Sequence, residues 1–257
     1  MRNVLAVAGK ELRHYFHSPI AYLVMTVWTA LCGFIFYVLT GNLVAQTLRM
    51  QMMGRGAPPM SLNEFIIRNM LQGILMVVLL FLLPLVTMRL YAEEKRSGTI
   101  ELLVTSPLTD LQIILGKFLG ALALYAVLVA IAFLYIGVLF IYGNPNAKPL
   151  IANALGLLLF GAALLALGMW FSTFTKNQII AGVVSMVAFL VLWILDWTQS
   201  FSTGKVASVA SYMSLSTHLD NFAKGVIDLG DTVYFVSLVA LGIFLTARSV
   251  EALKGRA

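Results

Sequence analysis

The residues that could do chemistry gather in a polar segment, residues 91–107, between two long apolar runs. Its adjacent glutamates invite comparison with a membrane-embedded metalloprotease. Such a site also needs histidines on neighbouring spans, and the three histidines lie outside the spans predicted below. Charge concentrated in one loop instead indicates a docking site for a soluble partner. The predicted docking residues are Glu93, Glu94, Lys95, Arg96, Ser97, Gly98, Thr99, Ile100, Glu101, Leu102, Leu103 and Pro107.

The second half of this segment predicts a short apolar helix. Ser97-Gly98-Thr99 is typical of a turn, Thr99 can cap a following helix, and Pro107 ends it. Glu101 suits the positive end of the helix dipole. An apolar helix at the tip of a loop is costly in water, so we expect it to dock in a partner's groove. The alternative, a helix lying on the bilayer, stays open.

Composition indicates the elements that hold this segment. The 257 residues are 60% hydrophobic and 11% charged, against about 25% charged in soluble domains. Residues 118–147 and 149–175 lack Asp, Glu, Lys and Arg, and each run is long enough to cross a bilayer. The fold class predicted is therefore an all-α polytopic membrane protein, and the excess of basic residues needs no nucleic-acid partner.

Six transmembrane helices are predicted from the apolar runs. Pro84 lies inside the second and is a hinge candidate, with a static packing kink as the equal alternative. After the second span, Thr109-Asp110-Leu111-Gln112 matches a capping box, which predicts a helix start at that point. The spans are Ile20–Thr40, Leu71–Tyr91, Phe118–Tyr142, Leu150–Phe171, Gln178–Trp197 and Thr232–Ser249.

The distribution of basic residues predicts the orientation. With the N-terminus inside, eleven Lys and Arg residues lie on the cytoplasmic side and six on the other. We therefore expect both termini in the cytoplasm and the protein in the inner (plasma) membrane. The first apolar run is too long for a cleavable signal peptide.

The first nineteen residues predict a basic amphipathic helix at the cytoplasmic surface, where it contacts the lipid bilayer. Leu12, Tyr15 and Phe16 belong to its apolar face, whereas Lys10 and Arg13 belong to its polar face. A membrane anchor and a partner contact stay open as its role. The candidate residues of this interfacial helix are Lys10, Glu11, Arg13, Tyr15 and Phe16.

The stretch from Glu93 to Leu103, followed by Thr105-Ser106-Pro107, resembles the signature of ATP-binding-cassette (ABC) transporter permeases of the type-2, exporter-like superfamily. Lys10-Glu11-Leu12 and Ser18-Pro19 fit the same pattern. Residues 216–229 resemble the branch associated with gliding motility and nitrous-oxide-reductase maturation.

The resemblance implies a coupling helix within residues 93–107 that fits a cleft on an ATP-hydrolysing subunit. It also implies an interfacial helix at residues 2–17 and short helices in residues 200–231 that re-enter the membrane from outside. The permease would pair with a second permease subunit, as a homodimer or heterodimer, while ATP and magnesium bind the partner ATPase. An extracytoplasmic partner is a further implied option.

We therefore expect one permease domain over residues 1–257. Its parts are an interfacial helix (1–19), a six-span bundle (20–249), a cytoplasmic coupling loop (92–108), an outer, re-entrant segment (198–231) and a cytoplasmic tail (250–257).

The missing motifs bear on the rival functions. None of the Gly-Lys pairs has the upstream glycine and following Ser or Thr of a phosphate-binding loop, so we expect ATP to be bound and hydrolysed by a separate subunit, with no enzyme activity or bound cofactor in this chain. No metal is expected either, because His14 and His17 share a helix face without a third ligand. The predicted span centres lack ionisable residues, which disfavours an ion-driven secondary transporter. A non-transporting scaffold that transmits force stays open beside a transporting permease, and the substrate and direction stay undetermined.

Overall fold

The computed structural model describes residues 2–53, 62–99, 108–143, 145–197 and 204–254, and every regular element in these ranges is helical. The elements are α1 (Arg2–His17), α2 (Pro19–Met52), the π-helix η1 (Asn63–Ile74), α3 (Leu75–Thr87), α4 (Ala92–Ser97), α6 (Asp110–Tyr142), α7 (Ala147–Ser172), α8 (Gln178–Ile194), the short 3₁₀ helix η2 (Leu195–Trp197), α10 (Lys205–Tyr212), α11 (Leu215–Ala223) and α12 (Leu229–Lys254).

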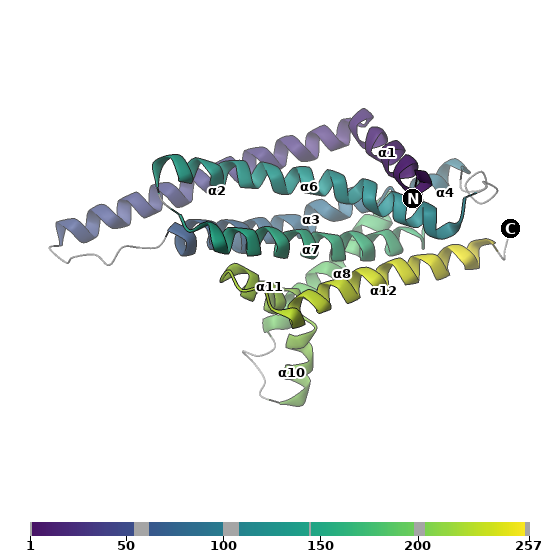
Figure 1. The fold of residues 1–257 in the computed structure, drawn as a ribbon. Helices are drawn as coiled ribbons and strands as arrows, with labels where there is room; N and C mark the ends of the chain where they lie inside the picture. Colours follow the sequence, from purple (N-terminus) through teal and green to yellow (C-terminus); the bar gives the residue numbers. More distant parts are fainter. Residues whose placement is uncertain (1, 54–61, 100–107, 144, 198–203, 255–257) are drawn as a thin grey trace.

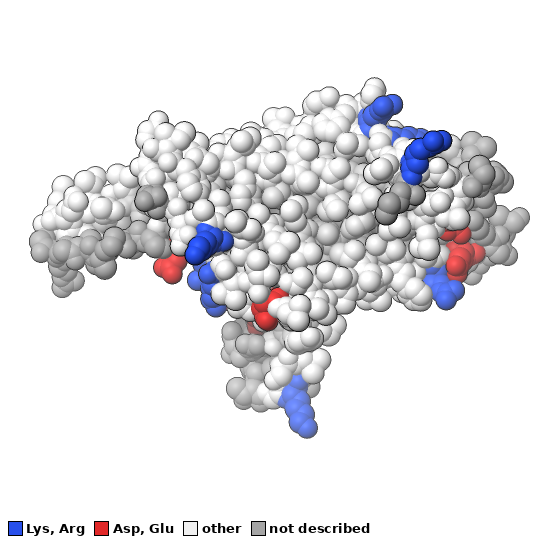
Figure 2. All heavy atoms as spheres, in the orientation of Figure 1, with Lys and Arg blue, Asp and Glu red and all other residues white. Residues whose placement is uncertain are grey.

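Within the described ranges, six helices are long and apolar enough to cross a membrane, which confirms the predicted fold class. They run back and forth along one axis, so that α1, α4 and the last turns of α12 lie at one end of the molecule, here called the terminal end (Figure 1). The far end of α2, η1 and α11 lie toward the other, here called the opposite end. Charged side chains gather toward these two ends on the face seen in Figure 2, with a broad uncharged band between them.

The second and third spans begin earlier than the apolar pattern predicts. The second candidate span runs from Glu64 to Ser97 and starts as the π-helix η1, while the third starts at Asp110. The predicted starts are late because charged residues, Arg68 and Lys117, interrupt the apolar pattern just before each predicted span. In the structure each is paired with a carboxylate, so each can belong to a helix.

Helix α7 forms the centre of the bundle and packs most extensively against α12. Small residues allow this close approach: a Cβ added at Gly242 of α12 would lie 2.6 Å from the Ala166 carbonyl carbon of α7. On other faces of α7, a Cβ added at Gly161 would lie 2.1 Å from the Tyr125 ring of α6, and one at Gly168 would lie 2.4 Å from Thr87 Oγ1 of α3. The Tyr125 hydroxyl donates to the Leu157 carbonyl over 2.6 Å, which satisfies a polar group buried in this packing.

Helix starts follow local capping signals. The capping box at Thr109 and Gln112 is present, so the predicted start of α6 at Asp110 is confirmed. Ser18 caps α2 by accepting from the Ile20 N–H, and Pro19 occupies the first turn, where its missing N–H costs nothing.

Two short helices, α10 and α11, follow η2, and α10 projects from the side of the bundle (Figure 1). Ser214 caps α11, which buries Leu215, Leu219 and Phe222 against the bundle. The sequence places His218 in a loop between two spans. In the structure it lies within α11, because Ser214 starts a helix there. Re-entry of this segment into the membrane stays a prediction.

Candidate partner-docking site

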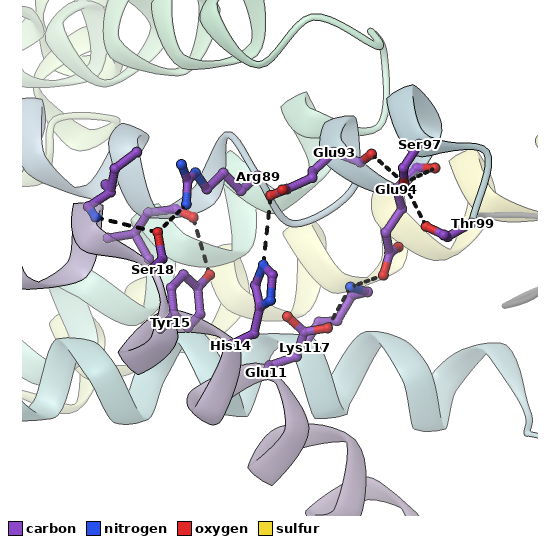
Figure 3. Close-up of polar contacts among 12 residues, drawn as sticks. Glu11, His14, Tyr15, Ser18, Arg89, Glu93, Glu94, Ser97, Thr99 and Lys117 are labelled. Carbon is purple, nitrogen blue, oxygen red and sulfur yellow. Dashed lines mark hydrogen bonds and ion pairs between the residues drawn. The ribbon is translucent and has the colours of Figure 1, made fainter.

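A buried ion cluster at the terminal end joins three helices. Lys117 Nζ of α6 lies 2.8 Å from Glu11 Oε1 of α1 and 2.6 Å from Glu94 Oε1 of α4 (Figure 3). Only 2% of the Lys117 side chain is exposed, against 13% for Glu11 and 17% for Glu94. We call these three residues the ion triad. Because charges this far from solvent need partners, the triad holds its three helices together.

Two glycines on α6 bring Glu11 to Lys117. A Cβ added at Gly116 would lie 2.5 Å from Val7 Cβ, and one at Gly120 would lie 2.7 Å from Glu11 Cβ. The two glycines, four residues apart, form a shallow groove that lets α1 approach α6 closely. The contact between α1 and α6 is among the most extensive in the molecule.

The α4 stalk ends in a sharp turn toward the predicted coupling helix. Gly98 has φ +74°, the left-handed conformation that favours glycine at a helix C-terminus. Ser97 Oγ donates to the Glu93 carbonyl over 2.9 Å and lies 2.8 Å from Thr99 Oγ1. Lys95 Nζ donates to the Thr173 carbonyl at the end of α7, so α4 is bound to a fourth element.

Further contacts fix α1 beside the α3–α4 connection. The Tyr15 hydroxyl donates to the Val86 carbonyl over 3.2 Å, and burial raises the pKa of Tyr15 well above its usual range, so the hydroxyl stays protonated. Arg89 Nη1 donates to Ser18 Oγ over 2.7 Å.

Beside the triad is a cavity of about 280 Å³. Its lining comes from α1 and the α4 region and includes Lys10, His14, Glu93 and Thr99. His14 Nε2 lies 3.9 Å from Glu93 Oε2 across it (Figure 3).

The structure thus brings together much of the predicted site. Glu93, Glu94 and Lys95 contact α1, α6 and the end of α7. Phe16 packs against the core, whereas Arg13 and Arg96 are exposed. Five predicted docking residues lie outside the described residues: Ile100, Glu101, Leu102, Leu103 and Pro107.

Sequence reasoning missed the residue at the centre of the triad. The predicted third span begins at Phe118, which leaves Lys117 outside it as one of the eleven basic residues that indicate the orientation. Two signals could have found it: the Gly116-x-x-x-Gly120 spacing, and a lysine about two turns inside a helix whose start the capping box marks. The contact between Arg89 and Ser18 could not be predicted from the sequence, because it depends on the tertiary fold.

The described residues contain no group of three His, Cys, Asp or Glu side chains that could hold a metal ion. What the structure shows at this site is an attachment: α1, α4 and α6 share one buried cation.

Comparison with known protein families gives the membership of the chain. A family described as "ABC-2 family transporter protein" matches residues 46–247, more than half of the chain. A search of curated proteins finds no significant match. Membrane subunits of the matched family typically pair with an ABC ATPase and generally lack catalytic activity of their own. The chain belongs to the ABC-2 transporter family and is a permease, a membrane subunit of an ABC transporter.

Proposed function

We propose that a separate ABC ATPase subunit docks on residues 93–107 and that the ion triad passes its movement into the bundle. The observation that carries this proposal is the buried Lys117, which binds one carboxylate from α1 and one from α4. The result is substrate export or force transmission across the membrane.

The triad ties both ends of the proposed docking segment together. Glu94 lies at the start of that segment and Lys117 lies after its end, so the 2.6 Å ion pair closes the base of the loop. Glu11 adds α1 to the same base, and Lys95 adds the end of α7. A push on the loop therefore acts on α1, α4 and α6 together, because none of the three can move away without exposing a buried charge. The hydrogen bond of Lys95 adds the end of α7 to the same movement.

Pro84 is the proposed bend point above this base. It lies buried inside α3, where it lacks the N–H for a helical hydrogen bond, and α3 ends three residues later at Thr87. The Met88 N–H still donates to the Pro84 carbonyl over 2.9 Å, so the helix is weakened on one side only. Movement of α4 would tilt the second span about this position.

The orientation and partners complete the proposal. Both termini and the docking segment face the cytoplasm, in agreement with the excess of basic residues at that end. ATP and magnesium bind the ATPase, and a second permease subunit completes the membrane core. Residues 216–229 favour the branch associated with gliding motility and nitrous-oxide-reductase maturation, in which transmission of force without transport is the second candidate outcome.

Cysteine cross-linking tests the docking surface. Cys32, the chain's single cysteine, is buried and can be removed as Cys32→Ser. In that background, Thr99→Cys should cross-link to the co-expressed cognate ATPase. Lys148→Cys, at the exposed start of α7, is the matched control and should not. If only Lys148→Cys cross-links, the ATPase binds the end of the molecule away from residues 93–107, and the proposed docking surface is wrong.

ATP hydrolysis by the reconstituted complex tests the coupling step. Glu94→Lys should lower the stimulation of the ATPase while membrane insertion is unchanged, because it places a second cation beside Lys117. Lys117→Arg keeps the charge and should retain more stimulation than Lys117→Met. If all three variants stimulate the ATPase as much as the parent does, the proposal is refuted. Transport down an ion gradient without any ATPase would refute it too.

A further inference from the structure

A buried histidine toward the opposite end has no part in the docking proposal. The side chain of His218 on α11 is 7% exposed, and that of Asp231 on α12 is 8% exposed. His218 Nδ1 lies 2.7 Å from Asp231 Oδ1, and His218 Nε2 lies 2.8 Å from the carbonyl oxygen of Tyr212 at the end of α10. We call these three residues, together with Asn221 and Tyr234, the histidine cluster. It joins three helices through one imidazole ring.

The two contacts of the ring fix the number of protons in the cluster. A backbone carbonyl only accepts hydrogen bonds, so Nε2 must carry a hydrogen to bond to Tyr212. The contact with Asp231 needs a second hydrogen, either on Nδ1 or on the carboxyl group. A neutral imidazole beside an ionised carboxylate holds one hydrogen in total. The closed cluster therefore holds one proton more than that pair.

The neighbouring groups favour placing this additional proton on the imidazole. Asn221 Nδ2 donates to Asp231 Oδ2 over 2.7 Å, and such a bond is stronger when the acceptor is an ionised carboxylate. The ring of Tyr234 stacks on the imidazole with the ring centroids 3.8 Å apart. Because the face of an aromatic ring attracts a cation at this distance, it also favours the charged imidazolium.

Charged side chains on the other elements packed against α11 have different partners or are exposed. Arg68 of η1 and Lys224 pair with Asp220, and Asp196 of η2 accepts from Thr217. Helix α8 contains no charged residue. The exposed ones are Glu64, Lys148, Lys205 and Asp228. The proton on the ring therefore depends on the groups of the histidine cluster itself.

Loss of the additional proton removes the contact between His218 and α10. A carboxylate is a stronger acceptor than a carbonyl, so the hydrogen that remains stays on Nδ1, toward Asp231. Nε2 then faces the Tyr212 carbonyl as one acceptor against another, and the two repel. Helix α10 projects from the bundle (Figure 1), and at least half of Tyr212 and of Met213 is exposed, so little packing opposes its movement.

We propose that the histidine cluster is a proton-binding site that sets the position of α10. With the additional proton bound, the end of α10 is held against α11 and α12, and without the proton it is released. Because the closed form binds the proton, α10 is held at low pH and released as the pH rises. Histidine ordinarily exchanges its proton between pH 5 and 8, so the test compares pH values on both sides of this range. The inference is independent of the docking proposal, and its test needs no ATPase.

Nitrogen-15 NMR measures the proton directly. In a variant with His14→Gln and His17→Gln, two exposed positions, His218 is the single histidine and gives the histidine signals. The full-length chain is labelled with nitrogen-15 histidine and placed in phosphatidylcholine nanodiscs. Both ring nitrogens should be protonated at pH 5, whereas Nε2 should be unprotonated at pH 9. Ring signals that do not change between these two pH values would overturn the proposal.

Spin labelling measures the movement of α10. Lys205→Cys, at the exposed first residue of α10, is labelled in the Cys32→Ser background. The ratio of mobile to immobile label should rise with pH by up to about tenfold per pH unit, the limit for release of one proton. His218→Gln should abolish this pH dependence. The exposed His17→Gln is the matched control and should leave it unchanged.

A further variant separates the proton from other contacts of α10. The Tyr234 hydroxyl donates to the Met213 carbonyl over 2.7 Å. Tyr234→Phe keeps the stacked ring but removes this bond, so label mobility should rise at every pH while its pH dependence stays. Mobility that does not change with pH in the parent, or a pH dependence that survives His218→Gln, would overturn the proposal. If His218→Gln does not fold, the nitrogen-15 NMR decides.

Discussion

The two ends of the molecule both bury contacts between titratable side chains, but these contacts join different parts of the chain. At the terminal end, Lys117 binds Glu11, 106 residues earlier, and Glu94 on a third helix. At the opposite end, His218 Nδ1 lies 2.7 Å from Asp231 Oδ1, only 13 residues later. The first arrangement links distant elements, whereas the second is a local clasp between α11 and α12.

The balance of charge also differs between the ends. The triad has one cation for two carboxylates, and Glu94 Oε2 is buried with no hydrogen-bond partner among the described residues. At the opposite end, one carboxylate, Asp220, is shared by two cations, Arg68 and Lys224, and all three side chains are between 41% and 51% exposed. The triad is buried, so its three helices are expected to move as one body, whereas the charges at the opposite end are screened by solvent.

The largest effect is expected at the triad. Lys117→Met leaves two carboxylates buried without their cation, and breaking a buried ion pair in this way costs about 3–5 kcal/mol of stability. Thermal unfolding in nanodiscs, followed by intrinsic fluorescence, measures the loss.

Two controls separate burial from charge. Lys176→Met removes an exposed lysine at the same end and should change stability by less than about 0.5 kcal/mol. Adding Glu11→Gln and Glu94→Gln to Lys117→Met should restore most of the stability, since no buried charge remains unpaired. If the triple variant is as unstable as Lys117→Met, packing and not charge holds the cluster.

A smaller loss is expected for Asp231→Asn at the opposite end. Asp231 Oδ1 lies 2.7 Å from His218 Nδ1 and Oδ2 accepts from Asn221 over 2.7 Å. An asparagine would set its own NH₂ against one of these groups, at a cost of about 2–3 kcal/mol. The exposed Asp228→Asn is the control. Equal unfolding temperatures for the two variants would show that the contacts of Asp231 with His218 and Asn221 add no stability to the fold.

The overall fold was predictable because its signals are local or repeated. The six spans follow from apolar runs longer than a bilayer crossing, and the start of α6 follows from the Thr109 and Gln112 capping box. Each signal involves residues close in sequence, so a reader of the sequence can recognise it without knowing the partners.

The candidate sites were predictable only in part, because their pairing depends on the tertiary fold. Glu94 was named as a docking residue, but its link to Lys117 and Glu11 crosses three helices. Arg68 was assigned to a loop because a charge interrupts the apolar pattern. Its partner Asp220 lies 152 residues away and could not be identified from spacing.

The cost of adding a side chain at a glycine with positive φ can be compared between the two ends. Gly98 at the terminal end and Gly225 at the opposite end are the described residues with positive φ, at +74° and +81°. A Cβ at Gly98 would meet nothing within 4 Å, whereas one at Gly225 would lie 2.8 Å from Pro149 Cα. Gly98→Ala should therefore cost about 1 kcal/mol from backbone strain alone.

Gly225→Ala should cost about 2 kcal/mol or more, since crowding adds to the strain. The unfolding temperatures of the two alanine variants measure the difference. Gly98→Pro should also reduce ATPase stimulation, because proline cannot adopt a positive φ. A greater loss of stability for Gly98→Ala than for Gly225→Ala would contradict this ranking.

The smallest effect is expected from the pH dependence of Asp220. Burial raises its pKa, but the hydrogen bonds from Lys224 and Arg68 outweigh burial and hold the pKa below its usual value of 3.8. A carboxyl group with a lowered pKa stabilises the fold above the pKa of the unfolded chain, and that contribution is lost as pH falls through the folded pKa. Asp220 thus contributes fully at neutral pH and progressively less below about pH 4. Because its side chain is 41% exposed, solvent screens the pairs and the contribution should stay below about 1 kcal/mol.

The unfolding free energies of the parent and of Asp220→Asn, compared at pH 7 and at pH 3, measure this contribution. The gap in unfolding free energy between the two proteins should narrow as the pH falls. A gap that widens in acid would mean that the protonated carboxyl is the stabilising form and that Arg68 and Lys224 do not pair with it in solution.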